Sequence, residues 1–186
     1  MAYLSLILIT MTTLKTPDLD IEKIFNFNNF ENNQVMIVND TVMGGRSYSQ
    51  YSMDEKTVTF NGDVSLKNNG GFASLRMVWP FDDTNALNKI QLKLTGDGKK
   101  YQFRLRTDRG YDGASYVYEF ETIKDTSMVI EMTLEQFIPS FRGRVLTNMP
   151  KLRLEDVKQM GLLIAGKQTG KFSIQLESIS VLPKLR

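Results

Sequence analysis

The segment YQFRLR, residues 101–106, decides the fold, because large apolar residues alternate in it with polar ones. Successive side chains of a β-strand point to opposite faces, so Tyr101, Phe103 and Leu105 share one face. The other face carries the polar residues Gln102, Arg104 and Arg106. A core covers one face of such a strand, which leaves the arginines facing solvent, a groove or buried acids. The segment therefore predicts a half-buried strand of an antiparallel sheet.

The same alternation recurs along most of the chain after Thr57. It predicts strands near residues 58–66, 72–79, 90–94, 116–120, 128–134, 161–165 and 172–182. With a first strand or helical turn expected within 21–30, this gives about eight or nine short strands and few helical segments. The close spacing of the turn signals is typical of an all-β sandwich or jelly roll and argues against a βαβ protein.

Three local features sharpen this expectation. The run that starts at Val58 is either one strand or a hairpin interrupted near Asn61-Gly62. Residues 155–160 predict a short helix. The apolar phase slips between Leu176 and Ile179, which predicts a β-bulge in the last strand.

The chain has 186 residues, 41% of them hydrophobic, which suits one domain with a sizeable core. No repeat or linker divides it, so we expect a leader or flexible extension at 1–20 and a single sandwich domain at 21–186. The apolar run Tyr3–Ile9 is far shorter than the ~20 residues of a membrane span. It lacks the positive n-region and clear cleavage site of a signal peptide. We favour a cytoplasmic location, and export stays open if residues 1–20 act as an atypical signal.

The composition narrows the function. A net charge of +2, from 23 basic and 21 acidic residues, argues against a nucleic-acid partner. With neither cysteine nor histidine, the chain cannot form disulfides, zinc–thiolate sites or a serine–histidine triad. The carboxylates show no catalytic pair and no EF-hand spacing, although a calcium ion held by scattered oxygens stays open. We predict a protein that is not an enzyme, without cofactor or metal.

One glycine-rich segment is VNDTVMGGRSYS, residues 38–49. Its pair Gly44-Gly45, beside Asn39 and Asp40, lets the backbone turn sharply and approach another group closely. The segment is either a binding loop or a structural turn pinned by the two polar side chains.

A second glycine-rich segment, NNGGF, contains Asn69 and leads into a strand. It is either part of the same binding edge or a hairpin turn. The segment GLLIAGK, residues 161–167, begins like a Walker A loop, but Gln168 replaces the required Ser or Thr. Its LLIA core also indicates a buried strand, so we reject a phosphate cradle.

Basic side chains are the strongest polar candidates. Arg104 and Arg106 leave their strand on the face opposite Tyr101, and the segment FRGR adds Arg142 and Arg144. Guanidinium groups beside aromatic residues suit carboxylate, phosphate or sugar recognition. Solvated charge and structural ion pairs are the alternative. We predict that a ligand or partner is bound by these five residues together with Asn39, Asp40, Gly44, Gly45 and Asn69. We also expect the glycine-rich loops to lie close to the two arginines of the strand.

Five separated segments, in order, resemble the complex I intermediate-associated protein 30 family. They are VNDTVMGGRSYS (38–49), FNGDVSLKNNGGFASLR (60–76), GDGKKYQFRLRTD (96–108), FIPSFRGR (137–144) and MGLLIAGKQTGKFSIQLESISV (160–181). The resemblance covers about residues 25–182 and implies a galactose-binding-like jelly-roll sandwich, which agrees with the alternation. Mitochondrial members of the family act as assembly factors for respiratory complex I. Bacterial members resemble carbohydrate-binding modules in fold, and the Asn- and Lys-rich composition suits a bacterial member.

The chain departs from the family at two aromatic positions. The family often has a Trp just before the VND motif, where this chain has Val35 and Met36, and another near Met128. Only Trp79 remains. If those aromatic residues form a ligand platform in relatives, the platform is weakened in this chain. If they are core residues, Met and Val replace them with a modest loss of volume.

Three hypotheses follow. The first, which we favour, is a non-enzymatic, assembly-factor-like or chaperone-like module that contacts a protein partner, such as a subunit of a respiratory complex. The second is a carbohydrate-binding module that uses a concave face with Tyr101, Arg104 and Arg106. The third is an enzyme that acts through carboxylates or arginine, which requires two acids to converge in one pocket.

Overall fold

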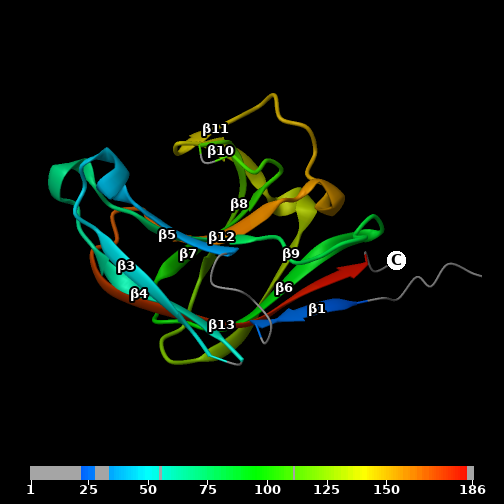
Figure 1. The fold of residues 1–186 in the computed structure, drawn as a ribbon, viewed down its shortest axis with the longest axis horizontal. Coiled ribbons are helices and arrows are strands. Elements are labelled where there is room, and N and C mark those ends of the chain that lie inside the picture. Colours follow the sequence, from blue (N-terminus) through cyan, green and yellow to red (C-terminus); the bar gives the residue numbers. More distant parts are fainter. Residues whose placement is uncertain (1–21, 28–33, 55, 111, 184–186) are drawn as a thin grey trace, which may run out of the picture.

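Two antiparallel sheets lie face to face and enclose the core, as the alternation predicts (Figure 1). The computed structural model describes residues 22–27, 34–54, 56–110 and 112–183. The predicted fold class, an antiparallel β-sandwich of the jelly-roll kind, is confirmed. The expected leader at 1–20 lies outside the described residues.

The two sheets interleave segments from the whole chain. The six-stranded sheet has the order β3-β4-β13-β6-β9, with β1 also paired to β13. Its strands are β1 (Lys23–Asn26), β3 (Tyr48–Met53), β4 (Val58–Val64), β6 (Leu87–Thr95), β9 (Ser127–Thr133) and β13 (Gly170–Pro183). The seven-stranded sheet has the order β11-β10-β8-β7-β12-β5-β2. Its strands are β2 (Val35–Asn39), β5 (Ala73–Val78), β7 (Lys100–Arg106), β8 (Ser115–Glu121), β10 (Ile138–Phe141), β11 (Arg144–Val145) and β12 (Gln159–Ile164).

The helical segments of the described chain are short 3-10 turns between strands. They are η3 (Asp40–Met43), η4 (Lys67–Asn69), η5 (Leu134–Gln136) and η6 (Leu154–Asp156). None of the helices in the described part is long and apolar enough to cross a membrane. The short helix predicted at 155–160 is present as η6, but its bounds were wrong, because η6 ends at Asp156 and β12 already begins at Gln159.

The core follows the inward alternation of the strands. On β7, Tyr101, Phe103 and Leu105 are each 0% exposed, and they belong to one cluster with Phe60 and Ile174 of the other sheet. Burial of such a side chain stabilises the fold by roughly 1.5–3 kcal/mol. The prediction that Tyr101 binds a ligand is corrected, because its ring packs inside the sandwich and does not reach an outer face.

Two strand details resolve the open alternatives. β4 runs unbroken through Asn61-Gly62. Gly62 serves close strand packing there, because a Cβ atom at this position would lie 2.1 Å from the Tyr48 carbonyl oxygen of β3. The predicted bulge in β13 is confirmed, since its register against β6 shifts between Leu176 and Ser178.

Candidate functional site

Three arginines meet on the outer face of the seven-stranded sheet. Arg104 and Arg106 alternate outward on β7, and Arg76 does the same on β5. Gly161 of β12 lies between these strands, paired with Arg76 on one side and with Arg104 on the other. Two strand spacings separate Arg76 from Arg104 by roughly 10 Å between backbones. A Cβ atom at Gly161 would lie 2.4 Å from the carbonyl oxygen of Leu75, so glycine is needed for the close packing of β12 against β5. We call this surface the arginine face.

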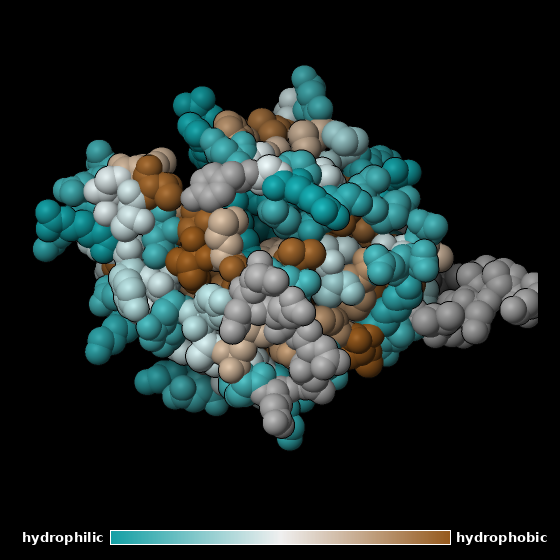
Figure 2. Space-filling model, viewed as in Figure 1, coloured by the Kyte–Doolittle hydropathy of each residue, from teal (hydrophilic) through white to brown (hydrophobic). Residues whose placement is uncertain are grey.

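The arginine face is hollowed. A cavity of about 570 Å³ lies over it, and loops from both ends of the sheet close its rim. Its lining comprises Val38, Val42, Met43, Phe72, Ser74, Arg76, Arg104, Arg106, Asp112, Gly113, Ser115, Ser140, Phe141, Arg142, Gly143, Leu163 and Ala165. Figure 2 shows hydrophobic residues grouped on the left of this view, beside the loop that carries η3, with hydrophilic residues in the recess next to them. The hollow therefore combines positive charge with an apolar rim.

The arginines of β7 donate their hydrogen bonds to neutral acceptors. Nε and Nη2 of Arg104 lie 3.1 and 2.6 Å from Oε1 of Gln102. Nη1 of Arg106 donates to the carbonyl oxygen of Gly113 and, at 3.4 Å, to that of Ala114. Within the described residues, neither arginine forms an ion pair with a carboxylate.

Burial and mutual repulsion act on these charges. The pKa of Arg104 is lowered to about 10, first by burial and then by the charges of Arg106 and Arg76. The pKa of Arg106 is also lowered to about 10, by burial and by Arg76, against the opposing effect of Asp108 and Asp112. Both side chains stay charged at neutral pH, and only Arg106 is partly compensated by nearby acids.

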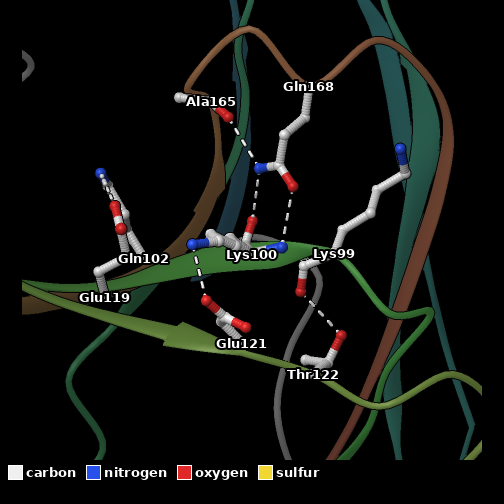
Figure 3. A network of polar contacts seen from close by, with 8 residues as sticks. All are labelled: Lys99, Lys100, Gln102, Glu119, Glu121, Thr122, Ala165 and Gln168. Atoms are coloured by element: carbon white, nitrogen blue, oxygen red, sulfur yellow. Dashed lines mark hydrogen bonds and ion pairs between the residues drawn. The ribbon is translucent and has the colours of Figure 1, made fainter.

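In the other half of β7, the polar side chains of the same face pair with acids of β8 (Figure 3). On the same face of the strand, Lys100 forms an ion pair of 2.6 Å with Glu121, its partner across β8. Gln102 donates to Glu119, also directly opposite, at 3.2 Å. The pairing residue of Arg104 in the same register is Val117. The row of acids on β8 therefore ends before the position that pairs with Arg104.

Asp40 organises the glycine-rich loops. It follows β2, is 0% exposed, and accepts hydrogen bonds from the Ser47 hydroxyl and from the N–H groups of Ser47, Gly71 and Phe72. Burial alone would raise the pKa of Asp40, but these hydrogen bonds outweigh it and hold the pKa below 3.8. A Cβ atom at Gly45 would lie 2.3 Å from the carboxylate, so glycine is needed for this approach. Asp40 is therefore a structural anion and does not face the cavity.

The two glycine-rich loops contact each other, as predicted. Residues next to the predicted ones extend from these loops to the arginine face. The side chain of Asn68 donates to the Gly44 carbonyl at 3.1 Å, and Ser49 donates to Oδ1 of Asn39 at 2.6 Å. Asn69 is exposed with a φ of 57° and is not among the cavity-lining residues. The loop residues that do reach the cavity are Val42, Met43 and Phe72.

The other two predicted arginines, Arg142 and Arg144, differ in their position relative to the cavity. Arg142 lines the cavity, but it is exposed, forms an ion pair with Asp112, and lies 5.2 Å from the Phe141 ring centroid. Arg144 is exposed and lies outside the cavity lining. Arg76 was not among the residues predicted from the sequence. Its signal was a single charge inside the apolar run ASLRMVW, in phase with Ser74 on the outward face of the strand.

Other features of the described chain are weaker candidates. No group of three or more acidic residues is placed to hold a metal ion in the ranges that the structure describes. A second hollow, of about 540 Å³, lies between η5 and η6. Its Arg153 is already bound by Asp156 at 2.8 Å, so its charge is compensated. The arginine face remains the candidate site.

The jelly-roll sandwich of this chain recurs among solved structures. The structure is similar to the family 11 carbohydrate-binding module from Clostridium thermocellum in complex with a β-1,3-1,4-mixed-linked tetrasaccharide. That comparison has a TM-score of 0.62 and 15% identity, covering 89% of this chain and 97% of that one. The module of the cellulosomal cellulase Lic26A-Cel5E gives a TM-score of 0.63 at 15% identity, with 89% and 96% covered. At this identity the likeness concerns the fold alone.

The sequence identifies the family. Residues 25–176 match Complex I intermediate-associated protein 30 (CIA30), and the chain belongs to this family. An uncharacterized protein of Schizosaccharomyces pombe is 24% identical over 177 residues, covering 84% of this chain and 81% of that protein. A Caenorhabditis elegans protein, named probable complex I intermediate-associated protein 30, mitochondrial, is 23% identical over 161 residues. These cover 74% of this chain and 46% of the nematode protein, so the chain spans about half of that relative. These relatives are eukaryotic, and the bacterial origin stays a prediction.

Proposed function

We propose that this chain is a non-catalytic binding domain that holds a protein partner on the arginine face. The observation that carries the proposal is the combination of arginines with exposed apolar side chains on one hollowed surface. Met36, Val78 and Ile138, which are 37%, 43% and 53% exposed, project from the strands on the same face as the arginines. Arginine and methionine are enriched in protein interfaces, and grouped exposed apolar side chains mark interaction sites.

A binding role agrees with the chemistry that the chain can offer. Its sequence contains no histidine or cysteine to act as a base, nucleophile or soft metal ligand. Asp40, the most deeply buried carboxylate beside the site, has its oxygens occupied by donors from its own loops. The charged groups of the hollow are arginines, which hold anions and seldom transfer protons.

The names of the nematode relatives supply the biological context. They associate those proteins with intermediates of complex I, and we extend to this chain an assembly-factor-like role with a protein subunit as partner. Family membership supports this extension, while the low identity leaves the particular partner to experiment.

Site-directed photo-crosslinking tests the proposal. A benzophenone amino acid would replace Met36 or Ile138 on the arginine face and, as a control, Val129 on the outer face of the six-stranded sheet. Val129 is 54% exposed, which makes it a matched surface position. We expect the two arginine-face positions to crosslink the same protein in an extract of the source organism, and Val129 to crosslink none. Crosslinks to a protein from Val129 alone would move the binding surface to the other sheet.

Carbohydrate binding is the second candidate, favoured by the hollowed face of a fold shared with family 11 modules. Sugar sites usually include an aromatic plane. The outward residues of β2, β5, β12, β7 and β8 include no aromatic side chain, so the aromatic residues of the cavity are Phe72 and Phe141 in its flanking segments. Met36 occupies one of the positions where the family often has Trp. Calorimetry with a β-1,3-1,4-mixed-linked tetrasaccharide decides between the candidates. We expect no heat of binding at millimolar sugar, and saturable binding that is lost in a Met36→Asp variant would favour the carbohydrate.

A further inference from the structure

We propose that Arg76, Arg104 and Arg106 form a carboxylate-binding site that receives an aspartate or glutamate side chain from an acidic segment of the protein partner. The inference rests on the proposed function and adds the chemistry by which the arginine face selects its ligand. The proposed site binds one carboxylate at a defined place in the hollow, in contrast to a general attraction between oppositely charged surfaces.

Arg104 and Arg106 form no ion pair with a carboxylate in the described part of the chain. Charges removed from water are strongly disfavoured unless a charge of opposite sign accompanies them. Arg104 and Arg106 are largely enclosed, repel each other, and donate only to amide and carbonyl oxygens in the described chain. Asp108 and Asp112 offset part of the charge of Arg106, whereas no carboxylate of the described chain acts on Arg104, so a carboxylate entering the hollow would supply the negative charge that Arg104 lacks.

The second argument is the register of β8. Its residues opposite Lys100 and Gln102 are Glu121 and Glu119, while Val117 stands opposite Arg104. An acid in place of Val117 would complete the ladder of cross-strand pairs. Because it is absent, the guanidinium of Arg104 keeps donors for a group that comes from outside the chain.

The third argument is geometric. Arg76, Arg104 and Arg106 all line the cavity of about 570 Å³, which has room for a small planar anion beside their guanidinium groups. Guanidinium and carboxylate groups form paired, parallel hydrogen bonds, which add direction to the attraction. The apolar rim formed by Val42 and Met43 suits a peptide with apolar side chains beside the acid, and not the hydroxyl groups of a uronic sugar.

Peptide binding tests the assignment. The probe is a capped heptapeptide with one central glutamate flanked by leucine and glycine, and its control replaces that glutamate by glutamine. Trigalacturonate serves as the acidic sugar. With the full chain in calorimetry at physiological ionic strength, we expect the glutamate peptide to bind about tenfold or more tightly than either competitor, the scale of a lost charge-assisted contact.

Three variants of the chain locate the effect. Arg104→Gln and Val117→Glu should each weaken the glutamate peptide about tenfold or more, the first by removing a donor and the second by supplying an internal carboxylate. Lys100→Gln is the matched control, because it removes one positive charge from the same face of the same strand. It should change the affinity less than about twofold. Circular dichroism and thermal melts verify that each variant is folded.

The outcomes separate this inference from the proposed function. Equal binding of the glutamate and glutamine peptides, or equal loss in Lys100→Gln, would overturn the carboxylate site. Tighter binding of trigalacturonate would reassign the arginines to an acidic carbohydrate and overturn the peptide. If Met36 and Ile138 crosslink a protein while the two peptides bind alike, the partner surface stands and the carboxylate site fails. If the arginines select the glutamate peptide but neither position crosslinks a protein, the anion site stands and the proposed protein partner fails.

Discussion

Asp40 and Arg104 carry charges that the fold removes from open solvent, and the protein treats the two charges in opposite ways. Asp40 is met by the hydroxyl of Ser47 and by backbone N–H groups, so its negative charge is stabilised. Arg104 is met by a neutral amide and by two further arginines. The pKa is lowered at both residues, but this favours the charged form of an acid and disfavours that of a base.

The difference supports a structural role for Asp40 and the proposed ligand-binding role for Arg104. A charge that the chain itself saturates stabilises the native state, as Asp40 does by joining two loops. A charge that the chain leaves without a counter-charge reduces stability unless something else binds it, and such sites are typical of function. Lys100 and Arg104 repeat the contrast within one strand, since Lys100 is paired with Glu121 and Arg104 is opposite Val117.

Removal of the saturated charge has the largest expected effect. Asp40→Ala leaves buried N–H groups without an acceptor and should lower the free energy of unfolding by about 3 kcal/mol. For a chain of this size that is a fall in Tm of roughly 6–12 °C, measured by thermal denaturation. Ser49→Ala, which removes a half-buried contact to Asn39 in the same region, is the control and should have a clearly smaller effect. A change below about 2 °C in Asp40→Ala would remove the structural role of this residue.

The acid dependence of stability follows from the same group. The pKa of Asp40 is below 3.8 in the folded state, so the unfolded state binds the proton first and protonation favours unfolding. The stabilisation is complete above the unfolded pKa and is lost as the pH falls through the folded value. The Tm difference between wild type and Asp40→Asn should therefore be constant above about pH 5 and shrink below pH 3.8. A difference that stays constant down to pH 2 contradicts this assignment.

A negative charge added on β8 should give Arg104 a cross-strand ion pair like the one that Lys100 forms with Glu121. Val117→Glu places a carboxylate opposite Arg104, on a face that already carries Glu119 and Glu121. We expect Tm to rise by about 1–3 °C, because a cross-strand pair replaces an uncompensated charge. Val117→Gln has a side chain of similar size without the charge and should give no rise. A fall in Tm for the glutamate variant, with the glutamine variant unchanged, would mean that the arginines already have their counter-charge.

Neutralising single cations gives the smallest effects, and their sign is the measurement. Arg104→Gln should leave Tm unchanged or raise it by about 1–3 °C, since it relieves repulsion from Arg76 and Arg106. Lys100→Gln should lower Tm slightly, because it breaks the ion pair with Glu121. Differential scanning calorimetry at low salt resolves the two. A marked loss of stability in Arg104→Gln would assign this residue to a structural contact.

Much of the fold could be predicted from the sequence, and part of the site. The alternation on β7 gave the inward and outward residues correctly, and the phase slip near Leu176 located the bulge. Gly62 was misleading as a turn signal, because close strand packing requires glycine as much as a turn does. Tyr101 was assigned to a ligand although its own alternation placed it with the core. Asp40 was found, but its saturation by distant N–H groups has no local signature.

The sequence by itself determined the sandwich, the absence of cysteine and histidine chemistry, and the membership in the CIA30 family. These properties depend on composition and on the pattern of neighbouring residues, and both can be read directly from the linear sequence. Only the tertiary structure decided that Arg76 joins Arg104 across Gly161, and that Val117, not an acid, stands opposite. The physical reason is that compensation of a charge depends on strand order and register. Pairing between segments far apart in the chain fixes both of these.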